Sequence, residues 1–257
     1  DGGLISGAIG LDGAEVNVTG KSITVSASAD GFSAVPTRFA AVTGVRADGG
    51  LYDQYGYEIT RNTQVNLDSK GDVDVSVSVT GDADAQSHNN ITYAAVAATE
   101  RGQVNITSAE GSVNINAENQ ASGERISDGG TYGIFSGYGL TERDLPSESD
   151  FSQRDRYNDS EYSQYMNQMG YENVNRAREE GTETKVTVNA AQDVNVNVNL
   201  GDAEHFGNAS AVKASYGDVE INAGNNVNIG TTLNGEYRGD KPLAALGLES
   251  GAATIKA

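Results

Sequence analysis

The sequence of 257 residues contains no cysteine, 3 prolines and 2 histidines. Without cysteine, the chain cannot be a small fold held together by disulfides, and it has no thiol nucleophile. With so few prolines it is neither a collagen nor a proline-rich linker, although it contains 32 glycines. No apolar run reaches the length of a transmembrane helix, so we expect no membrane insertion in this chain.

Basic residues are scarce as well. Lysine and arginine together number 17 against 36 aspartates and glutamates, which gives a formal net charge of −19. A chain without a basic stripe cannot neutralise phosphates, so nucleic acid is disfavoured as a partner, and the charge also disfavours anionic membrane surfaces. We interpret the negative charge as a means of keeping the chain soluble.

The chain does contain a recurring phrase. Two apolar β-formers separated by a small polar residue are followed, after a turn marked by Gly or Asp, by a second such pair. Examples are QVNLDSKGDVDVSVSV at 64–79, QVNITSAEGSVNINA at 103–117 and KVTVNAAQDVNVNVNL at 185–200. Self-similarity at a fixed internal spacing indicates a repeat architecture.

A strand of small residues precedes each double phrase, for example Thr92–Ala98 and Ala209–Ala214. The full unit, here called a rung, therefore has three strands. Six rungs follow one another at about 1–31, 32–82, 83–120, 121–202, 203–235 and 236–257, the last incomplete. We predict an all-β fold, a right-handed parallel β-helix with a small helical insertion. The alternative, a β-sandwich, would not repeat matched triplets of strands.

The end of the chain resembles the start of another rung, since Ala253–Ala257 reads as a new strand. No initiator Met or signal peptide opens the sequence. We therefore expect residues 1–257 to be a single β-helix segment of a larger protein, a monomeric rod that continues into further rungs.

Alternation along the strands predicts which residues face the interior. Apolar residues of each pair point inward and stack on those of the next rung at about 4.8 Å, and the small-residue strand supplies Ala and Gly where the core is narrow. The outward positions are rich in asparagine, for which we predict ladders of amide hydrogen bonds along the stack rather than a catalytic role. The asparagines concerned are Asn17, Asn105, Asn114, Asn195 and Asn228.

Two rungs depart from the compact pattern, and both do so between the first and the second strand. A loop insertion occupies 46–61 and a partly helical insertion occupies 141–182, whereas the third rung has only 99–102 at this place. Rungs two and four lie about 10 Å apart, so the insertions can meet over rung three. Insertions on one face of a solenoid often form its binding face, so if this segment binds a partner, we predict that the partner binds there.

Exposed tyrosine and arginine are the residues most suited to recognition, because they combine contact area with a polar tip. The candidate ligand- or partner-binding residues are Tyr52, Tyr55, Tyr57, Arg154, Arg156 and Tyr157. In the alternative interpretation the insertion only braces the rod. A stripe at helical spacing within it then packs inward, formed by Tyr162, Tyr165, Met166 and Met169.

Signals of catalysis are few. His88 and His205 lie in different rungs, and no nucleophile elbow, P-loop or zinc-protease motif is present. Acidic residues recur after the third strand, at Asp30, Asp82, Asp84 and Asp202, where paired carboxylates could hydrolyse a glycoside or bind Ca²⁺. No calcium-loop spacing accompanies them, so we expect solvated turns, no metal, no cofactor and no enzymatic activity. A carbohydrate-active β-helix enzyme, a lyase or glycosidase, remains the alternative.

The phrases GDVDVSVSV at 71–79, GSVNINA at 111–117 and QDVNVNVNL at 192–200 resemble the repeats of filamentous-haemagglutinin-like exoproteins. That family includes two-partner-secretion adhesins and autotransporter passengers of bacteria. The resemblance implies a secreted or cell-surface rod, the shaft of a large adhesin, whose partner is a cell-surface protein or glycan. It carries over no binding residue, since the repeat has no ligand motif, and a purely structural spacer is a further alternative.

Overall fold

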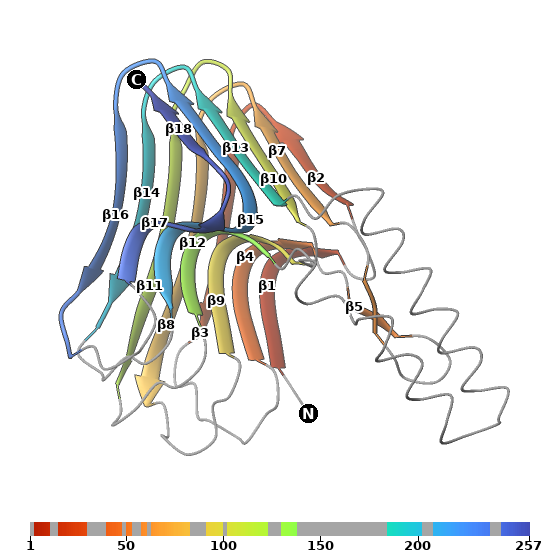
Figure 1. Cartoon of the computed structure of the whole chain (residues 1–257), viewed down its shortest axis with the longest axis vertical. Coiled ribbons are helices and arrows are strands. Elements are labelled where there is room, and N and C mark those ends of the chain that lie inside the picture. The colour runs from red at the N-terminus through yellow and green to blue at the C-terminus, as the bar shows by residue number, and fades with distance from the viewer. Residues whose placement is uncertain are drawn as a thin grey trace, which may run out of the picture.

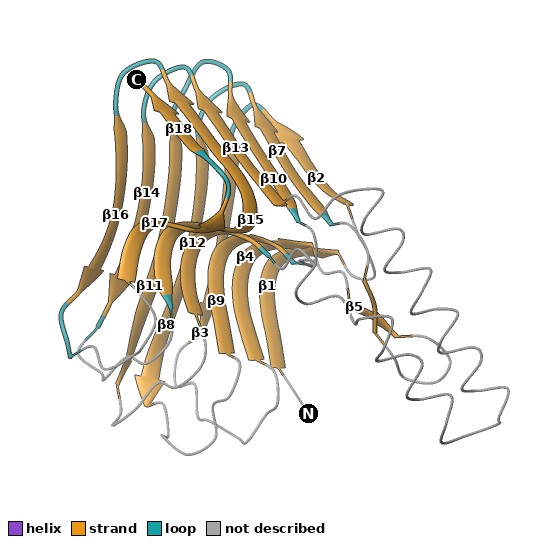
Figure 2. Cartoon of the chain, viewed as in Figure 1, coloured by secondary structure: helices purple, strands orange, loops and turns teal. Residues whose placement is uncertain are grey.

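The computed structural model describes residues 3–10, 15–29, 40–47, 50–52, 58–60, 63–82, 91–99, 102–122, 130–137, 184–201, 208–236 and 243–257. Within these ranges all regular secondary structure is β-strand (Figure 2). The predicted helical insertion at 141–182 lies outside the described residues.

The strands form three parallel sheets, one for each position in the rung (Figure 1). Sheet A contains β1 (Gly3–Gly10), β4 (Ala40–Ala47), β9 (Ile91–Ala98), β12 (Gly130–Ser136), the first part of β15 (Ala209–Ala223) and β17 (Leu243–Ser250). Sheet B contains β2 (Glu15–Gly20), β7 (Gln64–Ser69), β10 (Gln103–Ser108), β13 (Thr184–Ala190), the second part of β15 and β18 (Ala253–Lys256). Sheet C contains β3 (Ile23–Ala29), β8 (Val73–Asp82), β11 (Val113–Ser122), β14 (Val194–Leu200) and β16 (Val227–Leu233).

Each sheet takes one strand from each of the first five rungs, and each strand pairs in parallel with its counterparts in the neighbouring rungs. This is a parallel β-helix, as the sequence predicts. A β-sandwich is wrong, because sandwich sheets are built from antiparallel neighbours. The sixth rung has strands in sheets A and B, β17 and β18.

The register between rungs is the one that the repeated phrases predict. The first valine of each double phrase forms one continuous column, Val16, Val65, Val104, Val186 and Val219. The first residue of each second pair forms another, Ile23, Val73, Val113, Val194 and Val227. Because side chains alternate along a strand, this register places every apolar residue of the phrase over another one.

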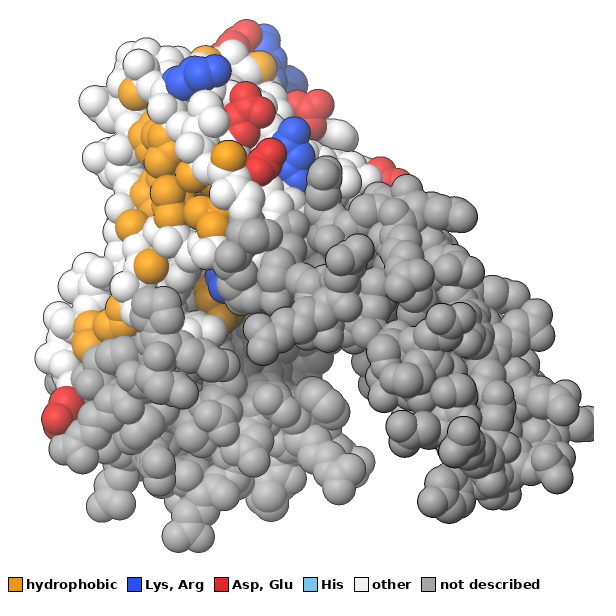
Figure 3. All heavy atoms as spheres, viewed as in Figure 1, with side chains coloured by type: hydrophobic (Ala, Val, Ile, Leu, Met, Phe, Trp, Pro, Cys, Tyr) orange, Lys and Arg blue, Asp and Glu red, His pale blue; other side chains and the backbone are white. Residues whose placement is uncertain are grey.

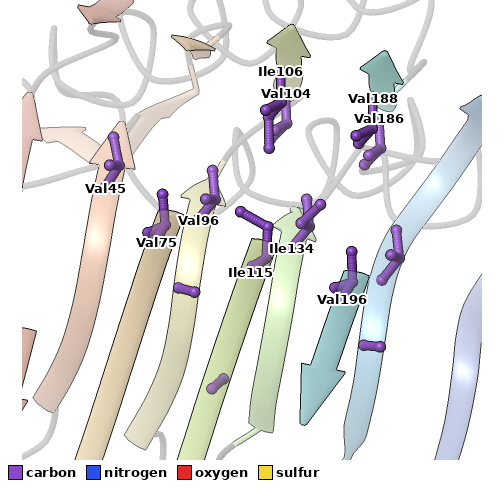
Figure 4. Packing of buried hydrophobic residues seen from close by; sticks show 14 of the residues in the cluster. Val45, Val75, Val96, Val104, Ile106, Ile115, Ile134, Val186, Val188 and Val196 are labelled. Carbon is purple, nitrogen blue, oxygen red and sulfur yellow. The ribbon is translucent and has the colours of Figure 1, made fainter. Parts of the chain in front are cut away.

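The core runs through the middle of the rod, where side chains from the three sheets point toward one another (Figure 4). In the central rung, Val104, Ile106 and Val113 are 0% exposed and Ile115 is 1% exposed. Full burial of a side chain of this size stabilises a fold by about 1.5–3 kcal/mol. The columns of Val and Ile are therefore the main source of stability.

A column of Gly and Ala crosses sheet A where it faces sheet C, as predicted for a narrow core. Its members are Gly7, Gly44, Ala95, Gly133, Ala211 and Ala245. A Cβ atom on Gly133 would lie 2.6 Å from Val196 Cγ1 and 2.6 Å from the carbonyl oxygen of Ala211. A Cβ on Gly44 would lie 2.6 Å from Val75 Cγ1. At these positions the backbone of sheet A rests directly on the valines of sheet C.

The predicted boundary of the first insertion is wrong by two residues, and its structure is not simply a loop. Arg46 and Ala47 belong to β4, where they pair with β9. Beyond them β5 (Gly50–Tyr52) and β6 (Glu58–Thr60) form an antiparallel hairpin. The hairpin was missed because strands of three residues are too short to show a period of two.

The first test concerns the core. Changing Ile115 to Asp places an unpaired charge among buried Val and Ile, which costs several kcal/mol. We expect this variant to lose cooperative thermal unfolding, measured by circular dichroism. The control is Asn197→Asp in the adjacent strand β14, where the side chain is exposed and little change is expected. Equal melting temperatures for the Ile115 variant and the parent chain would contradict the assigned register.

The second test concerns the narrow part of the core. Gly133→Val should lower the free energy of unfolding by about 1–3 kcal/mol, because its side chain must displace Val196 and the backbone of β15. Gly230→Val is the matched control, since the nearest atom to a Cβ there is Asn197 Oδ1 at 3.7 Å. Urea denaturation measures both. A Gly133 variant as stable as the Gly230 variant would show that sheets A and C are not in close contact here.

Candidate functional site

Both insertions leave the rod at the corner between sheet A and sheet B. The first joins β4 to β7, and the second joins β12 to β13. Rung three has only 99–102 between β9 and β10, and in rung five β15 continues through the corner without interruption. Figure 1 shows β5 standing away from the stacked strands on this side of the rod.

The structure places only one of the six candidate binding residues. Tyr52 is the last residue of β5, and its backbone is paired with that of Glu58 in the hairpin. The other candidates, Tyr55, Tyr57, Arg154, Arg156 and Tyr157, lie outside the described residues, as does the predicted Tyr/Met stripe. They stay predictions.

The two ends of the first insertion are tied to the turn of rung three. The Thr99 backbone N–H donates to the Ala47 carbonyl at 3.0 Å, at the point where the insertion begins. Where the insertion ends, the Thr63 hydroxyl donates to the Thr99 carbonyl at 2.7 Å and the Gln103 N–H donates to the Thr63 carbonyl at 2.9 Å. Thr63 is buried. This hydroxyl therefore fixes the returning end of the insertion against the next rung.

The second insertion is tied to the other side of the same turn. The Gly137 N–H donates to the Ala98 carbonyl at 2.7 Å where the insertion begins, and the Lys185 N–H donates to the Gly102 carbonyl at 3.1 Å just after it ends. The buried Ser136 hydroxyl adds a 2.6 Å bond to the Gly102 carbonyl. Only glycine fits at 102, because a Cβ would lie 2.1 Å from the Ala98 carbonyl oxygen.

The turn of rung three thus lies between the bases of both insertions. One strand spacing separates each base from the turn, so the bases are about 10 Å apart. The sequence predicts the corner but not the hydroxyls that hold the bases in place. These belong to Thr63 and Ser136, described above, and to Thr99, whose hydroxyl donates to the Ala47 carbonyl at 3.4 Å. Because Ser and Thr are frequent throughout the chain, no sequence signal singled out these three residues.

The outer faces of sheets B and C carry the asparagine ladders that the sequence predicts. On sheet B, Asn105 Nδ2 donates to Asn66 Oδ1 at 2.9 Å, and Asn66 Nδ2 donates to Asn17 Oδ1 at 2.8 Å. Asn66 Nδ2 also lies 3.2 Å from Glu15 Oε1. Each amide is thus held by the equivalent side chain of the rung before it.

The ladder on sheet C is longer and has the same direction. Asn228 donates to Asn195, Asn195 donates to Asn114 and Asn114 donates to Asp74, each from Nδ2 to Oδ1 at 2.8 Å. In both ladders the amides donate toward the N-terminal rung, and a carboxylate accepts at or near that end. A carboxylate is the stronger acceptor, so it stabilises the row of aligned amides.

Aspartates at the corner between sheets B and C accept hydrogen bonds from backbone N–H groups of the next rung. Asp72 Oδ1 accepts the Ser112 N–H at 2.8 Å, and Asp193 Oδ1 accepts the Asn226 N–H at 3.1 Å. In the part of the chain that is described, no group of three or more His, Asp or Glu side chains could hold a metal ion. Asp82 ends β8, while Asp30, Asp84, Asp202 and both histidines lie outside the described residues.

No family model, curated protein or solved structure matches this chain. The resemblance to filamentous-haemagglutinin-like exoproteins thus rests on the repeated phrases. Among the described residues, no helix has the length and apolar character needed to cross a membrane.

The third test concerns metal. We expect chelation with EDTA to leave the melting temperature unchanged within error, because the corner carboxylates of Asp72 and Asp193 are engaged by backbone N–H groups. Differential scanning calorimetry with and without chelator measures this, and calcium added back after chelation is the control. A large drop that calcium reverses would place a calcium site in the rod.

Proposed function

We propose that this chain is a shaft segment of a large secreted bacterial surface adhesin, and that it presents the two insertions at the sheet A–sheet B corner to a cell-surface protein or glycan. The observation that supports this most directly is the bracing of both insertion bases by the single turn 99–102. A rod that holds the bases of two inserted segments against one turn is suited to presenting both segments at the same corner.

The remaining described surface supports a scaffold rather than an enzyme. Asparagine side chains on the outer faces of sheets B and C are joined to one another in ladders, and the carboxylates of Asp72 and Asp193 accept hydrogen bonds from backbone N–H groups. General acid–base chemistry needs carboxyl groups or imidazoles that face a substrate. The alternatives are a β-helix lyase or glycosidase, whose carboxylates would lie near Asp82, and a spacer that binds nothing.

The fourth test removes the larger insertion. Deletion of 144–180 with a short Gly-Ser bridge should leave the β-helix folded, since the flanking strands β12 and β13 are paired with strands of the neighbouring rungs. Binding of the purified chain to bacterial and epithelial cells, measured by flow cytometry on coated beads, should be abolished. Full binding by a folded deletion variant would assign the function to the shaft, and a variant that fails to fold would identify the insertion as a brace.

A point-substitution series sharpens this test. Arg154, Arg156 and Tyr157 changed together to Ser should lower cell binding about tenfold or more, as expected for central recognition residues. Arg176 and Arg178 changed to Ser form the matched control within the same insertion and should have little effect. Equal losses in both variants would indicate a general effect of charge rather than a binding surface.

A further inference from the structure

The outer face of sheet A has an apolar centre. Within β12, Gly133 lies against Val196 of sheet C and Ile134 belongs to the buried core. Tyr132 and Phe135, on either side of this pair, therefore point away from the core. Their ring centroids are 4.8 Å apart. The hydrophobic cluster that they form, separate from the main core, consists of Ala94, Ala97, Tyr132 and Phe135.

The register extends this cluster into two rows that cross sheet A from rung two to rung six. The first row consists of Thr43, Ala94, Tyr132, Ser210 and Ala244, and the second of Arg46, Ala97, Phe135, Lys213 and Gly247. Neither row contains a carboxylate, although the chain as a whole has a net charge of −19. The face is thus apolar at its centre, with one cation on either side, Arg46 and Lys213.

The outer faces of the other two sheets are polar. Figure 3 shows charged side chains of both signs over the strands of sheet B. Along β14 and β16 of sheet C the margin of the molecule is white, the colour of uncharged polar side chains and backbone. Such faces are compatible with water, whereas a contiguous apolar face is rarely left exposed.

The outer face of sheet A is buried in the folded chain. Tyr132 is 6% exposed, Phe135 is 5% exposed, and Ala94 and Ala97 are fully buried. The described strands in substantial contact with β12 are its neighbours in sheet A and strands of sheets B and C, which lie on the core side. No described strand therefore accounts for the burial of the two rings.

The segment that follows β12 is well placed to cover them. A Cβ atom on Gly137 would lie 2.8 Å from Phe135 Cε1, so the chain leaves β12 beside this ring. The next 14 residues, 138–151, can extend to about 46 Å, whereas the rows span about 19 Å. The large apolar side chains of this segment are Tyr138, Leu140, Leu145 and Phe151.

Charge favours the same segment. Its one basic residue is Arg143 and its four acidic residues are Glu142, Asp144, Glu148 and Asp150, which gives a net charge of −3. Lys213 is only 9% exposed, and a Cβ on Gly247 would lie 3.1 Å from its Cδ, so its stem lies along sheet A. A lysine held this way is stabilised by a nearby carboxylate.

We propose that the outer face of sheet A is the docking surface for residues 138–151. Their apolar side chains cover Tyr132 and Phe135, and their carboxylates lie near Arg46 and Lys213. The docked segment ends three residues before Arg154, so it fixes the start of the insertion's candidate binding residues against the rod. The docking is a contact within the chain and does not depend on the proposed function.

The fifth test uses the absence of cysteine from the chain. Ala97→Cys is combined in turn with Leu140→Cys, Leu145→Cys and Phe151→Cys, and each double variant is oxidised mildly with copper phenanthroline. At least one should form an intramolecular disulfide in most molecules, since this bond needs Cβ atoms within about 4.5 Å. Peptide mass spectrometry measures the fraction. No disulfide in any of the three overturns the proposal.

A matched set shows whether the cross-link is specific. Asn197→Cys, exposed on the outer face of sheet C, replaces Ala97→Cys and should give a cross-linked fraction about tenfold lower with the same three partners. Equal fractions in the two sets overturn the proposal. If Ala97→Cys does not fold, Ser210→Cys takes its place, because it lies beside Tyr132 in the first row.

Other occupants of the face give different products. Ala97→Cys with Met166→Cys tests the Tyr/Met stripe, and a disulfide there with none in 138–151 assigns the face to the later part of the insertion. A disulfide between two chains that each carry only Ala97→Cys assigns it to a second copy. Either result overturns the proposal.

A double-mutant cycle tests the charge pairing independently. Lys213→Glu should lower the melting temperature of the parent chain, and should lower it less when Glu142, Asp144, Glu148 and Asp150 are changed to their amides. Lys185→Glu, exposed on sheet B, is the control and should have the same effect in both backgrounds. An equal effect of Lys213→Glu in both backgrounds overturns the proposal.

Discussion

The register between successive rungs is the constraint on which the rest of the structure depends. Strand side chains alternate between the two faces of a sheet, so a slip of one residue would move Ile115 outward and Asn114 into the core. Such a slip would bury unpaired amides and expose an apolar column at the same time. The register that stacks the valines in the core also aligns the asparagines on the surface. Core packing and the asparagine ladders therefore favour the same strand register.

Register also explains why inserted segments do not disturb the rod. Between Asn114 and Asn195 the chain runs 81 residues, whereas between Asn195 and Asn228 it runs 33 residues, yet both pairs form the same 2.8 Å bond. The extra residues leave at a corner, where Ser136, Gly137 and Lys185 bind the neighbouring turn. The structure can thus accept a large segment at one corner while each strand keeps its partners.

The sequence predicts the strands and their register well because one physical rule repeats in every rung. A Val-x-Val pair next to a tight turn can bury its apolar side only against similar strands, and in sheets B and C such pairs from five rungs stack on one another. The small size of the residues in the column through Gly44, Ala95 and Gly133 was also predictable, because a narrow core admits only small side chains. The asparagine ladders follow from the same alternation.

The corner was harder to predict because its bonds join residues that are distant in the sequence. Thr63 and Thr99 are 36 positions apart, and Ser136 and Gly102 are 34 apart. Hydroxyl residues are frequent throughout the chain, so no pattern singles these out before the rungs are stacked. The hairpin of β5 and β6 was not predicted either, because its pairing is antiparallel and is not repeated in the other described rungs.

The unequal lengths of chain between ladder partners have a mechanical consequence. A pull along the rod axis would peel rungs away one at a time, because each rung is held mainly by its neighbours. The rise per rung is uniform, but the chain stored between the ladder partners on sheet C is not: 40 residues from Asp74 to Asn114, 81 from there to Asn195 and 33 from there to Asn228. Fully extended, the longest of these would release about 280 Å and the shortest about 110 Å. Detachment of the fourth rung would therefore lengthen the chain more than twice as far as detachment of the fifth, because the second insertion adds residues to the fourth rung.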